Sequence, residues 1–123
     1  MLSFEKANEI LTDAADNLPD EIYKSLNGGI VLLPAVVQHS EGARLYILGQ
    51  YHYEPWGFGR YITIHYGSFS RVYGHLEEPE QEEKLRGVLF HELTHHLEHQ
   101  AGDKSLEIQD ALDLETYKGG KGN

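Results

Sequence analysis

The stretch Gly87-Val-Leu-Phe-His-Glu-Leu-Thr-His-His-Leu97 decides how this chain folds, and it contains the pentad His91-Glu92-Leu93-Thr94-His95. Apolar residues recur along the stretch and just before it at Leu85, Val88, Leu89, Leu93 and Leu97. This spacing predicts an amphipathic helix whose apolar face is buried. With 3.6 residues per turn, His91 and His95 lie one turn apart on the same face, so both imidazoles can reach one metal ion.

The pentad has the pattern H-E-x-x-H, which on a helix is typical of zinc-dependent peptidases. His91 and His95 would be two zinc ligands, and Glu92 would act as the general base on a metal-activated water molecule. The hydroxide would attack a peptide carbonyl, and Glu92 would pass the proton to the leaving amine. The sequence therefore predicts a zinc metallopeptidase in which Glu92 is essential for turnover but not for metal affinity.

A catalytic zinc site takes three protein ligands and leaves a fourth position open to water, so a third ligand is required. After Gly102 the chain can reverse, and Asp103 is the first carboxylate to return toward the histidines. Asp103 is the predicted third ligand, although the same carboxylate would also suit the cap of a following helix. Glu107 is the alternative if that following helix packs alongside the first.

Two further histidines lie close to the pentad. His99 would be about 12 Å from His91 along a straight helix, which is too far for one ion with ligands about 2 Å away. It would be a ligand only if the helix broke before it. His96 points about 100° away from His95, so we expect it to face the core or to support the site.

Composition limits the classes of protein to consider. The length of 123 residues predicts one domain over residues 1–118 and a flexible tail at 119–123. The formal net charge of −10 makes nucleic acid and anionic membranes poor partners. The absence of cysteine excludes disulfide frameworks, thiolate zinc sites and cysteine nucleophiles. No apolar run is typical of a signal peptide or a membrane span, so we expect a cytoplasmic protein, with the oligomeric state left open.

Helix and strand signals are mixed along the chain. We predict helices at about residues 4–17, 19–26, 77–100 and 105–117, a short helical turn at 68–73, and strands at 30–38, 45–48 and 61–66, with an extension of the second strand to residue 53 left open. Ser3 is placed to cap the first helix, and Pro34 predicts an edge position or a bulge. The fold class is α+β, with a small sheet of three or four strands packed against an N-terminal helix and the long pentad helix, and with a C-terminal helix.

The stretch Tyr61-Ile-Thr-Ile-His-Tyr-Gly-Ser-Phe-Ser-Arg-Val-Tyr73, the acidic helix start after it and the segment Gly87–Leu97 resemble the minimal zincin-like metallopeptidases of bacteria. The N-terminal helix pair and the strand at Ile30 are also similar to that family, so the resemblance covers most of the chain. It implies a small zinc peptidase acting on a peptide or protein substrate.

The resemblance also implies where a substrate would bind. In zincins a strand at the sheet edge pairs with extended substrate, which would give that part to Tyr61–Tyr66; ordinary sheet is the alternative. Trp56 and Phe58 would either rim the cleft or belong to the core. A tyrosine could stabilise an oxyanion, and the sequence does not distinguish among the candidates Tyr53, Tyr66, Tyr73 and Tyr117.

The family's extended motif is H-E-x-x-H-x-x-G-x-x-D, in which the glycine bends the chain and the aspartate is the third ligand. This sequence departs from the motif because Glu98 stands at the glycine position and Gly102-Asp103 come two residues late. If two residues are inserted, Asp103 inherits the ligand role. If they are not, the resemblance does not identify the third ligand.

Two other readings of the pentad remain open. The chain could bind zinc and a peptide with little or no turnover. It could also hold a closed structural zinc through His91, His95, Asp103 and one more ligand such as Glu107, with no position left for water.

Overall fold

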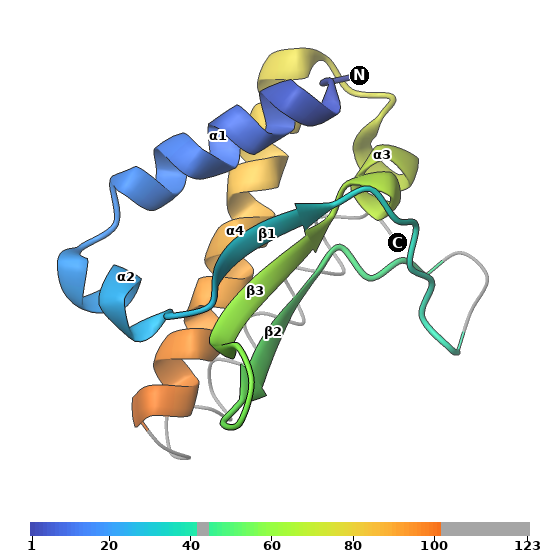
Figure 1. Cartoon of the computed structure of the whole chain (residues 1–123). Coiled ribbons are helices and arrows are strands. Elements are labelled where there is room, and N and C mark those ends of the chain that lie inside the picture. Colours follow the sequence, from blue (N-terminus) through green and yellow to red (C-terminus); the bar gives the residue numbers. More distant parts are fainter. Residues whose placement is uncertain (42–44, 102–123) are drawn as a thin grey trace.

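The computed structural model describes residues 1–41 and 45–101 (Figure 1). The elements in this part of the chain are α1 (Phe4–Asp16), α2 (Asp20–Ser25), β1 (Gly29–Leu33), β2 (Gly49–Glu54), β3 (Gly59–His65), α3 (Tyr66–Tyr73) and α4 (Glu78–Ala101). The predicted α+β class is confirmed. The predicted C-terminal helix and tail, together with Asp103 and Glu107, lie outside the described residues.

Local chemistry explains most of the element boundaries. The Ser3 hydroxyl accepts a hydrogen bond of 3.0 Å from the backbone N–H of Lys6, as predicted for the cap of α1. β1 ends at Leu33, five residues before the predicted end, because Pro34 has no N–H to donate to a neighbouring strand. β2 begins later than predicted, at Gly49, and the segment before it contributes only an isolated bridge between Gln38 and Tyr46.

The sheet has the strand order β1-β3-β2, with β1 parallel and β2 antiparallel to β3. The implied placement of Tyr61–Tyr66 at a sheet edge is therefore wrong, because β3 pairs with a strand on each side. Ile62, for example, is in register with Ile30 of β1 and with Tyr51 of β2. Within the described residues the edges belong to β1 and β2, and the sheet has three strands.

One face of the sheet is covered by α1 and α4, which also pack against each other (Figure 1). Ile62 and Ile64 project into this layer from β3 and are fully buried, and Leu89 of α4 meets them in the same core. Thr63 and His65, on the opposite face of β3, are buried as well. β3 is therefore covered on both faces as well as paired on both sides.

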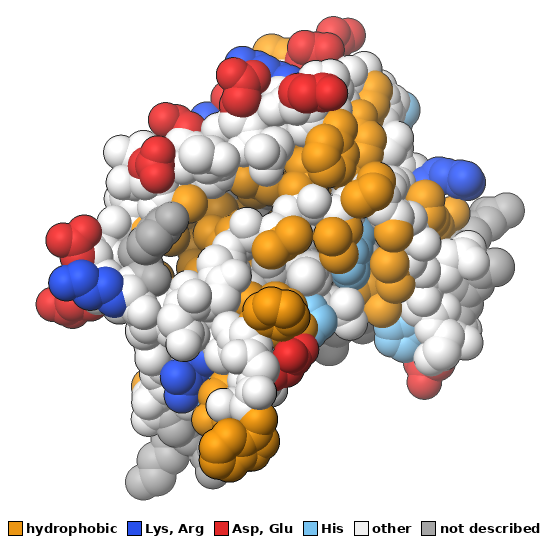
Figure 2. All heavy atoms as spheres, in the orientation of Figure 1, with side chains coloured by type: hydrophobic (Ala, Val, Ile, Leu, Met, Phe, Trp, Pro, Cys, Tyr) orange, Lys and Arg blue, Asp and Glu red, His pale blue; other side chains and the backbone are white. Residues whose placement is uncertain are grey.

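The outer surface separates charge from apolar area. In Figure 2, acidic side chains gather over the helices while hydrophobic side chains form a band across the strand side. Val31, Leu33 and Val36 are among the exposed apolar residues. Among the described residues, no helix has the length and apolar character needed to cross a bilayer.

Candidate metal centre and groove

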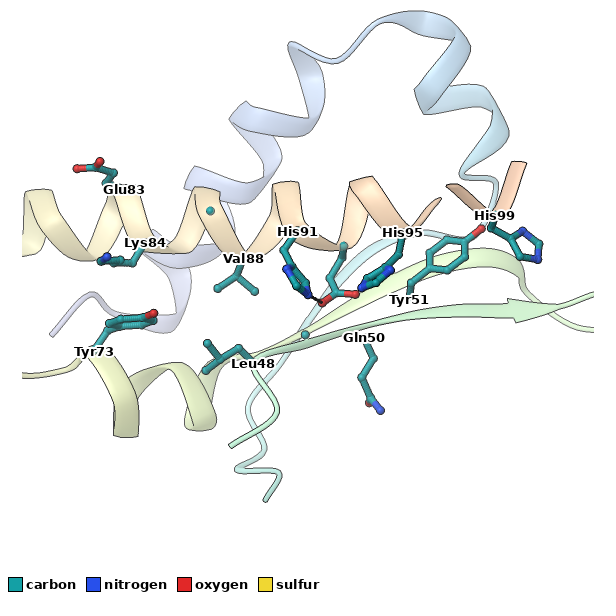
Figure 3. Close-up of a pocket in the computed structure, with 13 residues that line it drawn as sticks. Leu48, Gln50, Tyr51, Tyr73, Glu83, Lys84, Val88, His91, His95 and His99 are labelled. Carbon is teal, nitrogen blue, oxygen red and sulfur yellow. Dashed lines mark ion pairs between the residues drawn. The ribbon is translucent and has the colours of Figure 1, made fainter. Parts of the chain in front are cut away.

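His91 and His95 project from α4 toward β2, as Figure 3 shows. Their ring centroids are 5.0 Å apart and the rings meet edge to face at 84°. Both line a cavity of about 690 Å³ that also includes residues of β2. The structure therefore brings the two predicted ligands together at an open surface, because the uninterrupted helix keeps them one turn apart.

Glu92 lies deeper than the two histidines and is 5% exposed. Its Oε2 is 3.8 Å from Nε2 of His91. Glu92 lines the same cavity, so its carboxylate borders both His91 and the open space beside it. The predicted general base and the predicted ligands thus occupy one site.

Gly49 allows β2 to pass close to Glu92. A Cβ atom on Gly49 would lie 3.1 Å from Cγ of Glu92, 3.2 Å from Cδ1 of Ile64 and 3.2 Å from the backbone oxygen of Thr63. These contacts are tighter than ordinary van der Waals packing, so a side chain here would push against the Glu92 side chain. The missing side chain lets the first residue of the edge strand form part of the cavity wall.

The side chains present suit part of a zinc site. Zinc binds neutral imidazole and carboxylate groups, and two histidines open to one cavity can supply two of the three ligands of a catalytic site. Within residues 1–41 and 45–101, no group of three His, Asp or Glu side chains is close enough together to hold a metal ion. Asp103 and Glu107, the two predicted candidates for a third ligand, lie outside these ranges.

His96 is fully buried, as expected from its orientation. Its Nε2 is 2.8 Å from the Ser25 hydroxyl and its Nδ1 is 2.9 Å from the Tyr51 hydroxyl. Because the Ser25 hydroxyl donates to the Ile22 carbonyl, its oxygen accepts from His96 Nε2, which leaves Nδ1 to accept from Tyr51. Burial lowers the pKa of His96, with a smaller contribution from the nearby Arg60 charge.

His99 lines the far part of the cavity rather than joining His91 and His95. The helix continues without a break to Ala101, so His99 stays two turns beyond His91. The Nε–H of Arg60 donates to its Nδ1 at 3.5 Å, and its ring packs against Tyr53 at a centroid distance of 4.8 Å. These contacts place His99 in an aromatic and cationic cluster at one end of the cavity. We call this cavity between α4 and β2 the groove.

Tyr51 is a cavity residue that the sequence did not single out. Its hydroxyl is held by His96, and burial raises the pKa of Tyr51. Among the tyrosines considered from the sequence, Tyr73 also lines the cavity, whereas Tyr66 donates its hydroxyl to the Leu2 carbonyl. One sequence signal could have identified Tyr51 as a cavity residue. Gly49 and Tyr51 are two positions apart on one strand, and alternate residues of a strand share a face.

The opposite end of the groove has a different character. Leu48 and Val88 lie between the histidines and a pair formed by Tyr73 and Lys84 (Figure 3). The Lys84 ammonium is 5.6 Å from the centroid of the Tyr73 ring, within the range of a cation–π contact. The groove therefore passes from histidines through an apolar section to a lysine.

Trp56 and Phe58 are outside both the core and the cavity. They lie in the turn between β2 and β3 and are 99% and 74% exposed. The core reading of these aromatics is wrong, because the turn projects beyond the sheet instead of folding over it. Neither residue is part of the cavity wall.

Comparison with known proteins supports the architecture. No protein-family model matches the chain, and no curated protein is significantly similar to it. A solved structure of a conserved hypothetical protein from T. thermophilus is similar to this chain, with 28% sequence identity and a TM-score of 0.68. The similarity covers 81% of this chain and 98% of that chain, so the α+β fold described here recurs in a natural protein of comparable extent.

Proposed function

We propose that this chain is a zinc-dependent metallopeptidase with its active site in the groove between α4 and β2. The observation that carries the proposal is the convergence of His91, His95 and the buried Glu92 on one cavity. Two imidazoles open to solvent beside a buried carboxylate suit metal-assisted hydrolysis better than a structural role in the core. The predicted third ligand remains Asp103, with Glu107 as the alternative, and the cytoplasmic location remains a prediction.

A zinc ion bound here would supply a Lewis acid that polarises a carbonyl and favours deprotonation of water. Glu92 would accept the proton from the attacking water at a carboxylate oxygen and donate it to the departing amine. Burial excludes bulk water from this carboxylate, while the open cavity beside it admits a substrate. His91 and His95 would hold the metal and take no part in proton transfer.

The strand β2 is the natural place for an extended substrate. It is a sheet edge in the described part of the chain, and an edge strand offers unpaired backbone groups to an added peptide. Gly49, Gln50 and Tyr51 of this strand line the cavity next to Glu92. A peptide pairing with β2 would therefore run past the proposed metal site, in the role that the sequence resemblance gave to β3.

Cleavage of a peptide library by the full chain with added zinc tests the proposal. We expect Glu92→Gln to reduce cleavage by about 10²–10⁴-fold, the usual contribution of a general base, while zinc affinity stays within a few-fold of the original. Glu83→Gln is the matched control, because Glu83 also lines the groove but points away from the histidines (Figure 3). It should leave cleavage within about two-fold, since no proton transfer depends on it.

Two results would contradict this mechanism. Cleavage that persists in Glu92→Gln would remove Glu92 from its assigned role. Zinc and peptide binding without any cleavage would instead indicate a peptide-binding module, and a metal without an exchangeable water would indicate a structural site.

A further inference from the structure

We propose that Glu98 is a positioning residue that holds His95 in the tautomer and orientation needed to bind the metal. This inference rests on the proposed function, since it concerns the same two-histidine site. Oε1 of Glu98 is 3.3 Å from Nδ1 of His95, and the two residues are three positions apart on α4. Helical geometry therefore places the carboxylate beside the ring.

The burial of Glu98 requires an explanation. The residue is only 4% exposed, and glutamate is rarely buried to this degree unless it is paired, because removing a carboxylate from water is costly. An arrangement in which the carboxylate accepts the Nδ1–H of His95 offsets part of that cost.

The cavity wall shows on which side of the ring Glu98 lies. His95 lines the cavity, whereas Glu98 does not. The carboxylate therefore lies near Nδ1 of His95 without forming part of the cavity wall. When Nδ1 carries the proton, the lone pair resides on Nε2, and metal-binding histidines commonly use such a carboxylate to fix the second nitrogen.

The helix itself makes this contact possible. In the family that the sequence resembles, the position of Glu98 is a glycine at which the chain bends. Here α4 continues past that position to Ala101, so residue 98 keeps its helical relation to His95. In this chain, the position that is a glycine at a bend in the family is therefore a helical glutamate whose carboxylate supports His95.

The test compares the full chain with Glu98→Gln and Glu98→Ala, using Glu83→Gln as a surface control. Zinc affinity is measured by titration calorimetry near pH 8, where histidine is ordinarily neutral. We expect Glu98→Ala to weaken zinc binding by about 10–100-fold, the usual effect of losing such a partner. Glu98→Gln, which keeps an acceptor oxygen but no charge, should fall between Glu98→Ala and the unchanged protein.

A second measurement does not depend on the metal. Nitrogen-15 NMR of the zinc-free protein reports which nitrogen of His95 carries the proton. We expect the Nδ1–H form to dominate in the unchanged chain and the Nε2–H form to increase in Glu98→Gln. A purely structural role for Glu98 would not move this tautomer ratio.

The outcomes separate this inference from the proposed function. Zinc affinity within two-fold of the original in a folded Glu98→Ala variant would overturn the positioning role. An Nε2–H tautomer of His95 in the unchanged chain would overturn it even if that variant failed to fold. If the unchanged chain bound no zinc while His95 kept its Nδ1–H form, the metallopeptidase proposal and the metal part of this inference would fail, and only the His95–Glu98 contact would stand.

Discussion

At the scale of single residues, the site depends on short distances between side chains, and the local sequence pattern predicts only some of these distances. His91, Glu92 and His95 were identified from the sequence because their spacing within one helix fixes their relative positions. Tyr51 and Gly49 were not identified from the sequence. Their roles depend on contacts with residues of α4 that are about forty positions later in the sequence. Glu98 was noticed only as a departure from a motif, and its burial became visible only in the folded chain.

Replacement of Gly49 by alanine tests how tightly β2 packs on Glu92. The new Cβ would be 3.2 Å from the Thr63 backbone oxygen, which cannot move as a flexible side chain can. We expect Gly49→Ala to lower the free energy of unfolding by about 1–3 kcal/mol, a typical cost of overpacking, and to reduce cleavage by displacing Glu92. Urea denaturation followed by circular dichroism measures the first effect.

Gly87→Ala is the matched control for that variant. Gly87 also lines the cavity, but a Cβ added there would meet no atom within 4 Å. Because alanine favours a helix interior over glycine by about 1 kcal/mol, Gly87→Ala should stabilise the protein. If Gly49→Ala were as stable and as active as the original protein, β2 would be able to move away from Glu92 without affecting the site.

At the scale of elements, helices were predicted more accurately than strands. The pattern that predicted α4 is local, and the helix ends within a residue or two of the predicted bounds. The strand order could not be read in this way, because pairing joins segments distant in sequence. The alternating, β-rich segment 61–66 was compatible with an edge or a central strand, and the pairing of β3 with both β1 and β2 shows that it is central.

The outer face of the sheet contains a histidine that links stability to pH. Nε2 of His52 is 2.9 Å from the Thr63 hydroxyl, and its ring stacks on Tyr61 at a centroid distance of 4.5 Å. Burial lowers the pKa of His52 below its ordinary value of 6.5, and a nearby histidine adds to this effect while Glu54 opposes it. The folded state therefore favours the neutral ring.

The sign of the pH dependence follows from linkage. Below about pH 6.5 the unfolded chain binds a proton at His52 more readily than the folded chain, so the free energy of unfolding should fall as pH falls from about 7.5 to about 5. His52→Gln should reduce this dependence, as measured by urea denaturation at several pH values. If the free energy of unfolding depended on pH in the same way in His52→Gln as in the unchanged protein, protonation of His52 would not affect stability.

At the scale of the whole molecule, the core and the proposed site share one helix, α4. The helix that supplies His91 and His95 also supplies Leu85, Leu89 and Leu93 to the core. Metal binding on one face of α4 should therefore stabilise the entire fold, because a ligand that binds only the folded state raises its stability.

Thermal unfolding with and without a chelator tests that linkage. At a free zinc concentration about 100 times the dissociation constant, binding adds about 2.7 kcal/mol, which corresponds to a rise of roughly 10 °C or more in Tm for a domain of this size. His95→Ala should lose most of the shift, whereas Glu92→Gln should keep it. Identical melting curves for the unchanged protein in zinc and in chelator would count against metal binding.

The fully exposed Trp56 has a practical consequence for such experiments. It is the only tryptophan in the chain, and at 99% exposure its indole is already surrounded by water before any denaturation. Its emission wavelength should therefore change little when the domain unfolds. The same fluorophore is well placed to report a molecule that covers the β2–β3 turn, because desolvation of the indole would shift its emission to the blue.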